Sequence, residues 1–330
     1  MHLTLFLPSL LAAPRDALIA SPALAAMARR ALPPEYVAGG LAAALLAVAG
    51  VPPDTPLAPV AARGAGVDIG TDAIARADPI ALVAGRDNVL LNGRVDDVSA
   101  ADTQAILDRM NTHFADDGLV FFAPRPDTWF VRLIGIDPPQ TTSLARVHGA
   151  IHGHLPRGIA AGRWKRWMSE MQMLLHDDPR NAARERNGQM PVTGLWIADA
   201  GPAVTTAGDA SRRWFAPAGR DGDVARGLAP MGPGSVSSPP ATFALMPPGA
   251  DAIVILPPLR SAADVHAAMT AWLAPTLAAQ DNATLAGLSV IADDGRGAFT
   301  YSPRAESWWS RWRASARRQV FAPPTTPEPA

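Results

Sequence analysis

The sequence predicts an α/β protein, in which helices pack against the strands of a sheet. The first observation is an amphipathic helix within residues 162–201. Its apolar side chains recur at i, i+3, i+4, i+7 and i+11, the spacing of one helix face: Trp164, Trp167, Met168, Met171 and Leu175. The second observation is that short apolar runs typical of buried strands, such as residues 195–197, alternate with helical patterns along the chain.

The length and composition allow a sizeable packed core. The chain has 330 residues, enough for about two domains of roughly 150 residues each. Hydrophobic residues make up 48% of it and the formal net charge is −1, which argues against nucleic acid as a partner. There is no cysteine, which excludes disulfides and thiolate metal sites and is compatible with a reducing cytoplasm. We expect a cytoplasmic protein that binds no cofactor.

Neither apolar stretch near the N-terminus has the features of a membrane segment. Residues 2–7 lack a preceding basic region and are followed by Pro8, so we interpret them as a first buried strand rather than a cleaved signal. Residues 38–51 are uncharged but number only fourteen, and about twenty are needed to span a bilayer. This second stretch therefore predicts a buried Ala-rich helix, and no transmembrane segment is expected.

The N-terminal part predicts helices, a connection and a strand. Ala/Leu-rich helices are expected at residues 16–31 and 41–50. A shift to Pro, Gly and Ala over residues 52–72 indicates a surface connection or a domain boundary. A strand at residues 89–91 follows, with a hairpin-type turn at Asn92-Gly93.

A capped helix and two strands come next. Ser99 and Asp102 have the spacing of a helix start, with a hydroxyl at the N-cap and a carboxylate three residues on. The helix behind them carries an apolar face made of Ile106, Leu107, Met110 and Phe114. Residues 119–122 and 129–134 predict strands, which together with residues 89–91 form a small mixed or antiparallel sheet.

The C-terminal part is loop-rich before regular patterns return. Residues 201–250 are rich in Gly, Pro and Ser, and so long a connection is a functional loop or is poorly ordered. A buried strand at residues 252–256 precedes a second helix start at Ser261 and Asp264. Residues 288–292 and 298–301 predict a hairpin, and the Pro-rich end, residues 321–330, is expected to be disordered.

Several motifs together resemble a known family. They are ADPIAL (77–82), GRDNVLL (85–91), HLPRG (154–158), EMQMLLHDDPRN (170–181) with Arg184, Gly188 and Pro191 behind it, and DVARGLA (223–229). This combination resembles the bacterial family called regulatory protein RpfE, whose members often carry a phosphoglycerate mutase label. The resemblance covers most of residues 77–230 and implies a regulatory or binding role.

A remoter similarity is to the archaeal-type cofactor-independent phosphoglycerate mutases, which have a comparable Pro-x-Asn-x-x-Arg…Gly…Pro segment. This similarity implies an α/β fold with a degenerate alkaline-phosphatase-like core and an inserted small α+β domain. The core would comprise residues 1–75 and 205–320, and the insert residues 76–204.

The chain departs from the mutase pattern at the positions that bind metal in that family. There the first strand ends in a metal-binding Asp, whereas here the strand reads LTLFLPSLL and no acid precedes Asp16. The last strands of the family carry Asp-His ligands, whereas Asp293, Asp294 and Gly295 follow the equivalent strand here. A two-metal site needs about six to eight protein ligands. These departures make the predicted core degenerate.

Three histidines lie close together in the sequence: His148, His152 and His154. Imidazole binds zinc or copper, and i, i+4 spacing places two rings on one helix face. Gly149 and Gly153 disfavour a regular helix and no carboxylate is interleaved. A polar surface loop is therefore the preferred interpretation, and a metal site is the alternative.

The central motif offers candidate residues for a small anionic ligand, although no catalytic residue is predicted. Arg184 can bind carboxylate or phosphate in a bidentate way, and Asn181 can cap a short helix whose N-terminus favours anions. His176 adds an imidazole next to Asp177 and Asp178. The structural alternative is that Asn181 is only an N-cap and that Arg184 pairs with one of these two carboxylates.

The C-terminal tail combines tryptophans and arginines. One helical face carries Trp308, Trp309 and Trp312, surrounded by Arg311, Arg313, Arg317 and Arg318. This face could pack onto the core with its arginines solvated, or it could meet an anionic membrane surface or a protein partner.

Three functional hypotheses remain open. The first is a non-catalytic regulatory or binding protein related to phosphoglycerate mutases. The second is a divergent metal-dependent phosphotransferase of the mutase type, which requires Asp199, Asp251, Asp293 and Asp294 to converge. The third is a peripheral interaction protein that uses the Trp/Arg tail.

Overall fold

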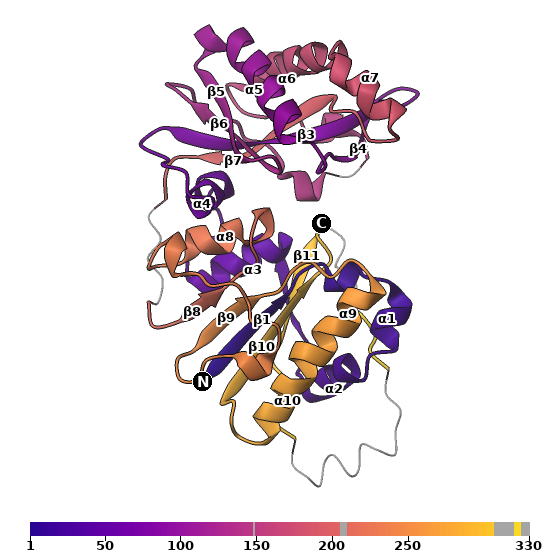
Figure 1. The fold of residues 1–330 in the computed structure, drawn as a ribbon, viewed down its shortest axis with the longest axis vertical. Helices are drawn as coiled ribbons and strands as arrows, with labels where there is room; N and C mark the ends of the chain where they lie inside the picture. The colour runs from indigo at the N-terminus through magenta and orange to yellow at the C-terminus, as the bar shows by residue number, and fades with distance from the viewer. Residues whose placement is uncertain (148, 205–209, 307–319, 325–330) are drawn as a thin grey trace. The chain divides into compact units, whose positions relative to one another are not determined.

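Two compact units make up the chain. The computed structural model describes residues 1–330 except 148, 205–209, 307–319 and 325–330. Unit 1 comprises Met1–Pro53 and Thr206–Ala330, and unit 2 comprises Asp54–Thr205. Both combine helices with a sheet (Figure 1), so the predicted α/β class is confirmed at this level.

Unit 1 is built on a six-stranded sheet with the order β2-β11-β10-β1-β9-β8. Its strands are β1 (His2–Leu7), β2 (Glu35–Ala38), β8 (Arg213–Phe215), β9 (Ala252–Ile255), β10 (Gly287–Asp293) and β11 (Gly297–Tyr301). β10, β1, β9 and β8 run parallel, and β11 and β2 are antiparallel to their neighbours. The central strands are apolar and buried on both faces, as expected for parallel strands covered by helices.

Helices cover both faces of this sheet. They are α1 (Arg15–Ile19), α2 (Pro22–Arg30), α3 (Gly40–Ala49), α8 (Arg220–Leu228), α9 (Ala262–Ala268) and α10 (Ala274–Asp281), with a π-helical turn at Met269–Leu273 between the last two. Leu3, Leu5 and Leu7 alternate along β1 and pack with the apolar side chains of α1, α2, α9 and the π-helical turn. α3 packs with α8 and against β10 and β11.

The local predictions for unit 1 are largely confirmed. Residues 2–7 form β1, and the Ala-rich stretch forms the buried helix α3. Ser261 caps α9 in a complete capping box with Asp264. β10 and β11 form the predicted antiparallel hairpin. The region 201–250 contains β8 and α8 as well as single 3-10 turns at Pro233–Ser235 and Phe243–Leu245, so it is more regular than predicted.

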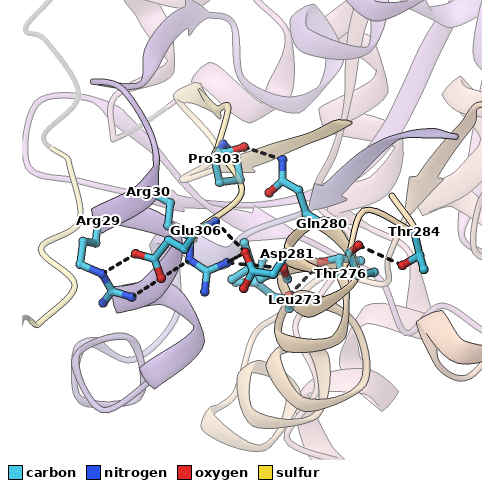
Figure 2. Close-up of polar contacts among 11 residues, drawn as sticks. Arg29, Arg30, Leu273, Thr276, Gln280, Asp281, Thr284, Pro303 and Glu306 are labelled. Atoms are coloured by element: carbon cyan, nitrogen blue, oxygen red, sulfur yellow. Dashed lines mark hydrogen bonds and ion pairs between the residues drawn. The ribbon is translucent and has the colours of Figure 1, made fainter. Parts of the chain in front are cut away.

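A network of ion pairs attaches the segment after β11 to the helices (Figure 2). The Glu306 carboxylate accepts hydrogen bonds from Arg29 Nε at 3.0 Å and Nη2 at 3.2 Å, and it pairs with Arg30 Nε at 3.2 Å. The backbone amide of Glu306 donates to Asp281 Oδ1 at 2.7 Å, and Arg30 also pairs with that carboxylate. Gln280 holds the carbonyl of Pro303 at 2.8 Å. This end of the chain is therefore pinned to α2 and α10.

The disordered tail was predicted to begin at residue 321, but Phe321 is ordered and buried. Phe321 is 1% exposed and packs near Tyr301, with 6.4 Å between the ring centroids. The prediction missed this anchor because one aromatic residue within a proline-rich segment gives no periodic signal. Residues 325–330 lie outside the described part of the chain.

Unit 2 is built on a five-stranded antiparallel sheet, larger than the small mixed or antiparallel sheet of three strands that was predicted. Its strands are β3 (Ala73–Ala84), β4 (Val89–Arg94), β5 (Leu119–Arg125), β6 (Thr128–Leu133) and β7 (Gly194–Gly201). The long strand β3 pairs with β6 through its first residues and with β4 through its last ones. β7 pairs along the opposite edge of β3, and β5 pairs with β6.

The helices of unit 2 lie on both sides of its sheet (Figure 1). They are α4 (Leu57–Gly64), α5 (Ala100–His113), α6 (Ala161–His176) and α7 (Pro179–Arg186), with 3-10 turns at Ala115–Asp117, Leu144–Arg146 and Ile151–His154. Ser99 caps α5 as predicted, and its side chain accepts from the amide of Asp102. Together α5 and α6 bury the main apolar cluster of this unit against the sheet.

Two local predictions need correction. Residues 52–72 were expected to be a surface connection or a domain boundary; the division between the units does fall here, at Pro53 and Asp54, but the stretch also contains α4, which buries Ala58, Val60 and Ala61 and contacts β3 and β7. The hairpin turn was expected at Asn92-Gly93, but both residues lie inside β4, next to a shift in its register with β3. The connection from β3 to β4 is at residues 85–88 instead, since Gly93 serves the bulge rather than a turn.

No helix among the described residues is long and apolar enough to cross a membrane.

Candidate functional site

The central motif is organised by two consecutive helices, α6 and α7. The predicted apolar face of α6 is confirmed, because its five buried residues are Trp164, Trp167, Met168, Met171 and Leu175. The N-cap of α7 is Asp178, whose side chain accepts from the amide of Arg180. Asn181 therefore does not cap this helix, contrary to the prediction. Pro179 occupies the first helical position, where its missing N–H costs nothing.

Asn181 is buried and clamps two backbone segments together. Its Nδ2 donates to the carbonyl oxygens of Leu175, at 2.7 Å, and Val192, at 2.8 Å. Its Oδ1 accepts from the amide of Val192 at 2.8 Å. Both amide protons are thus used to join the last turn of α6 to the segment that enters β7.

Arg184 is also committed to contacts within the fold. Its Nε donates to the carbonyl of Met190 at 2.8 Å and its Nη1 to the carbonyl of Asp97 at 3.2 Å, while Nη2 pairs with the Asp97 carboxylate. Burial alone would raise the pKa of Asp97, but hydrogen bonds from Arg184 and Gln189 outweigh it and lower that pKa. Arg184 therefore pairs with Asp97 and not, as was predicted, with Asp177 or Asp178. The sequence could not indicate this partner, because Asp97 lies 87 positions away along the chain.

The other candidates of the central motif, His176, Asp177 and Asp178, do not line a common pocket with Asn181 and Arg184 among the residues that the structure describes. His176 and Asp177 are exposed at the end of α6. Asp178 is buried and pairs with Arg180 at 2.9 Å and with Arg109 at 3.5 Å. This carboxylate therefore stabilises the junction between α6 and α7.

The histidines that the structure describes give no assembled metal site. His152 and His154 lie in the four-residue 3-10 helix Ile151–His154, where His152 is exposed and His154 is partly buried. Across the described residues, no three His, Cys, Asp or Glu side chains gather in a way that could hold a metal ion. The remaining candidates lie outside the described residues: His148, Trp308, Trp309, Arg311, Trp312 and Arg313.

The four acids of the phosphotransferase hypothesis do not all converge. Asp251 precedes β9 and binds the amide of His2 at 2.7 Å, at the amino end of the parallel strands. Asp293 ends β10 at the carboxyl end of the same strands. His2 aligns with Gly287, six residues before Asp293, so at about 3.3 Å per residue these two carboxylates are about 20 Å apart. Asp199 belongs to unit 2.

Asp293 is a buried acid at the carboxyl end of β10 in unit 1. It is 5% exposed and accepts from the amide of Ser9 at 2.7 Å and from that of Gly295 at 3.0 Å. Burial raises its pKa above the ordinary value of 3.8, although these two hydrogen bonds oppose the shift. Ser9 holds a left-handed backbone conformation, with φ of 59°, where β1 leaves the sheet. The turn after β1 and the end of β10 are thereby tied together.

A pocket of about 470 Å³ opens beyond the carboxyl ends of β8 and β9. Its wall is mostly proline, alanine and leucine, with one serine, one tryptophan and one aspartate. The residues that shape it are Pro217, Pro239, Pro240, Pro257, Pro258 and Trp272. Ligands of open α/β sheets bind outside the carboxyl ends of the strands, so this pocket is the candidate binding site of unit 1.

The sequence indicated the pocket only indirectly. Its lining comes from three separate segments, residues 217–218, 238–241 and 256–272. The Gly/Pro/Ser-rich composition of residues 201–250 predicted a functional loop, and part of this loop lines the pocket. No pattern in the sequence showed that the three segments meet.

Comparison with known proteins gives a likeness of fold. No family model matches the chain, and no curated protein matches it significantly. A cofactor-independent phosphoglycerate mutase from Thermoplasma acidophilum DSM 1728 aligns at 15% identity with a TM-score of 0.42, over 92% of this chain and 89% of the mutase. The PH0037 protein from Pyrococcus horikoshii aligns at 13% identity with a TM-score of 0.53, over 92% and 87%. The chain therefore shares a mixed α/β fold with PH0037.

Proposed function

We propose that this chain is a non-catalytic binding or regulatory protein, built on a fold related to the phosphoglycerate mutases. In this proposal, unit 1 is a degenerate alkaline-phosphatase-like core and unit 2 is its insert, so that the insert begins at Asp54 and not at the expected residue 76. The regulatory role implied by the resemblance to the RpfE family belongs to the same proposal. What the core retains would be a ligand site and not a two-metal centre.

The observation that carries the proposal is the arrangement at the end of β1. The mutase resemblance places a metal-binding Asp there, whereas this chain has Pro8 and Ser9. The amide of Ser9 is bonded to Asp293, so this buried carboxylate holds the turn after β1. Paired catalytic metals lie about 3.5–4 Å apart, and Asp251 is about 20 Å from Asp293 on the strand spacing given above. These two acids cannot share such a centre.

A divergent phosphotransferase is the second candidate, and one observation favours it. Buried carboxylates with a raised pKa cluster at functional sites, and Asp293 is such a group at the carboxyl end of a parallel sheet. Asp294 follows it, but its Oδ1 accepts from the amides of Arg296 and Gly297, at 2.8 Å each, and so shapes the β10–β11 turn.

The test is metal content and turnover of the full-length protein. Metal is measured by elemental analysis, and mutase and phosphatase activity with 3-phosphoglycerate is measured in added Mn²⁺ or Zn²⁺. We expect no stoichiometric metal and no turnover above that of an Asp293→Asn variant. Metal-dependent turnover that Asp293→Asn abolishes and Asp251→Asn retains would overturn the proposal in favour of the phosphotransferase.

A further inference from the structure

The pocket of unit 1 has the size of a small-molecule site. Its volume is about 470 Å³, and drug-sized ligands occupy pockets of about 300–1,000 Å³. The wall is predominantly apolar, with Trp272 on α9's continuation as its largest side chain. A ligand that fits would therefore be compact and largely apolar, because burying its polar groups without partners would cost binding free energy.

The two proline pairs make the wall rigid before any ligand binds. Pro239-Pro240 follow Ser237, whose amide donates to the carbonyl of Trp214 at 3.1 Å and whose carbonyl accepts from Ala216 at 3.0 Å. Both contacts fasten this loop to β8 and its end. A proline ring also fixes φ, so little conformational entropy remains to be lost when a ligand binds.

The second proline pair is fastened to the sheet in the same way. Pro257-Pro258 lie between Leu256, whose amide donates to the carbonyl of Phe6 at 3.1 Å, and Leu259, whose amide donates to that of Pro8 at 2.8 Å. The pocket is thus bounded by two loops, one bonded to the edge strand β8 and the other to the end of the central strand β1.

Asp264 sets the charge that the pocket accepts. Among the described residues that line the pocket, Asp264 is the one with an ionisable side chain. Its Oδ2 accepts from the hydroxyl and the amide of Ser261, both at 2.8 Å, and from the amide of Arg260 at 3.1 Å. The hydrogen bonds from Ser261 lower the pKa of Asp264, so the carboxylate is charged at neutral pH. In the described part of the chain, all three bonds go to Oδ2 and none to Oδ1.

This combination disfavours an anionic ligand. A phosphate ester or a carboxylate would meet an apolar wall and one negative charge, with no lining cation to pair with it. A cation on an apolar body would bury that body against the prolines and Trp272 while its charge approached Asp264 Oδ1. Arg260 is exposed and lies outside the lining, although its charge also acts on the Asp264 carboxylate, which is itself exposed at the rim.

We propose that this pocket binds a compact apolar molecule that carries one ammonium group, with Asp264 as its counter-ion. The proposal rests on the proposed function, because it names the class of ligand that a binding protein of this fold would take at its carboxyl edge. It excludes phosphoglycerate as the ligand of this pocket.

The test uses three probes that differ only in their polar end: 2-phenylethylamine, 2-phenylethanol and phenylacetate. Their affinities for the full chain are measured by isothermal titration calorimetry at low ionic strength. The amine should bind more tightly than the alcohol, and the alcohol more tightly than the acid. Asp264→Asn keeps an oxygen for Ser261 and should weaken the amine about two- to fivefold, the range of an exposed ion pair, without changing the alcohol.

Two further variants test whether the probes bind in this pocket. Ala267→Phe places a ring in the pocket from an exposed position and should abolish binding of both the amine and the alcohol. Asp102→Asn is the matched control, because it alters the equivalent carboxylate at the start of α5 in unit 2 and should leave all three affinities unchanged. Circular dichroism melts confirm that each variant is folded.

Equal binding of acid and amine, or binding of no probe at millimolar concentration, would overturn this inference. An amine affinity that Asp264→Asn leaves unchanged would also overturn it. Turnover of 3-phosphoglycerate, measured in the same samples with Mn²⁺, would instead overturn the proposed function. Failure of the inference and failure of the proposed function are therefore distinguishable.

Discussion

The Asn181/Arg184 cluster of unit 2 and the pocket of unit 1 use their polar groups in opposite ways. In the cluster, both amide protons of Asn181 and three guanidinium nitrogens of Arg184 are bonded to the protein itself. In the pocket, proline-rich loops leave a hollow with one carboxylate at its side. A dense polar motif can thus hold a fold together, while the space for a ligand arises where the sequence has no motif.

The largest effect should come from removing the clamp of unit 2. Asn181→Ala leaves the buried carbonyl and amide of Val192 without a partner and removes one bond to the carbonyl of Leu175, which still accepts from the amide of Asp178. We expect the free energy of unfolding to fall by about 3 kcal/mol, since each unsatisfied buried group costs about 1–3 kcal/mol. Urea denaturation measures it. Asn187→Ala, at an exposed position after α7, should change it by less than about 0.5 kcal/mol.

A somewhat smaller loss of stability should follow the substitution of Arg184 by lysine. Arg184→Lys keeps the charge, but an ammonium cannot bridge Met190 and Asp97 in the way that the planar guanidinium does. We expect a destabilisation of about 2 kcal/mol by urea denaturation, consistent with lost hydrogen bonds to a charged group. Arg186→Lys on the exposed side of α7 is the control. If Arg184→Lys left stability intact but weakened binding of an anion, the cluster would be a ligand site after all.

The buried acid of unit 1 should give a pH-dependent effect. Because burial raises the pKa of Asp293 in the folded state, its contribution to stability is full below the unfolded value of 3.8 and is lost as pH rises through the folded pKa. Asp293→Asn lacks this loss, so its stability relative to the unmodified protein should increase from pH 3.5 to pH 7. Denaturation curves across this range measure the difference. A difference that does not vary with pH would contradict the assigned environment of Asp293.

The smallest effect concerns the ion pairs of the C-terminal segment (Figure 2). Hydrogen bonds from Arg29 and the charge of Arg30 lower the pKa of Glu306, against a smaller opposing effect of burial. The carboxylate therefore contributes stability above its unfolded pKa, and this is lost as pH falls through the folded one. Glu306→Gln should cost less than about 1 kcal/mol at pH 7, and the cost should vanish in acid. If Glu306→Gln lowered the free energy of unfolding equally at acid pH, this segment would be held by contacts that do not depend on the charge of Glu306.

Features of the fold could be predicted from the sequence where they depend on residues close together along the chain. The apolar face of α6, the strand β1 and the caps at Ser99 and Ser261 depend on neighbours within a few residues, so periodicity and capping rules found them. Helix α4 was missed because its proline- and alanine-rich sequence is typical of a connection, although tertiary packing buries it.

The candidate site was less predictable for the same reason. The sequence singled out Asn181 and Arg184, but their partners Val192 and Asp97 are fixed by the tertiary fold. The pocket combines three segments that are distant in sequence, and its hollow shape results from how those segments meet. Composition could mark residues 201–250 as a functional loop, but it could not give the class of ligand.

The most direct test of this account is the melting temperature of the full-length protein with each of two additions, 2-phenylethylamine or 3-phosphoglycerate with Mn²⁺. A ligand that binds only the native state must raise the melting temperature. The account predicts a rise with the amine that is lost in Ala267→Phe, and no rise with the phosphoglycerate and metal. A metal-dependent rise with 3-phosphoglycerate, and none with the amine, would contradict it.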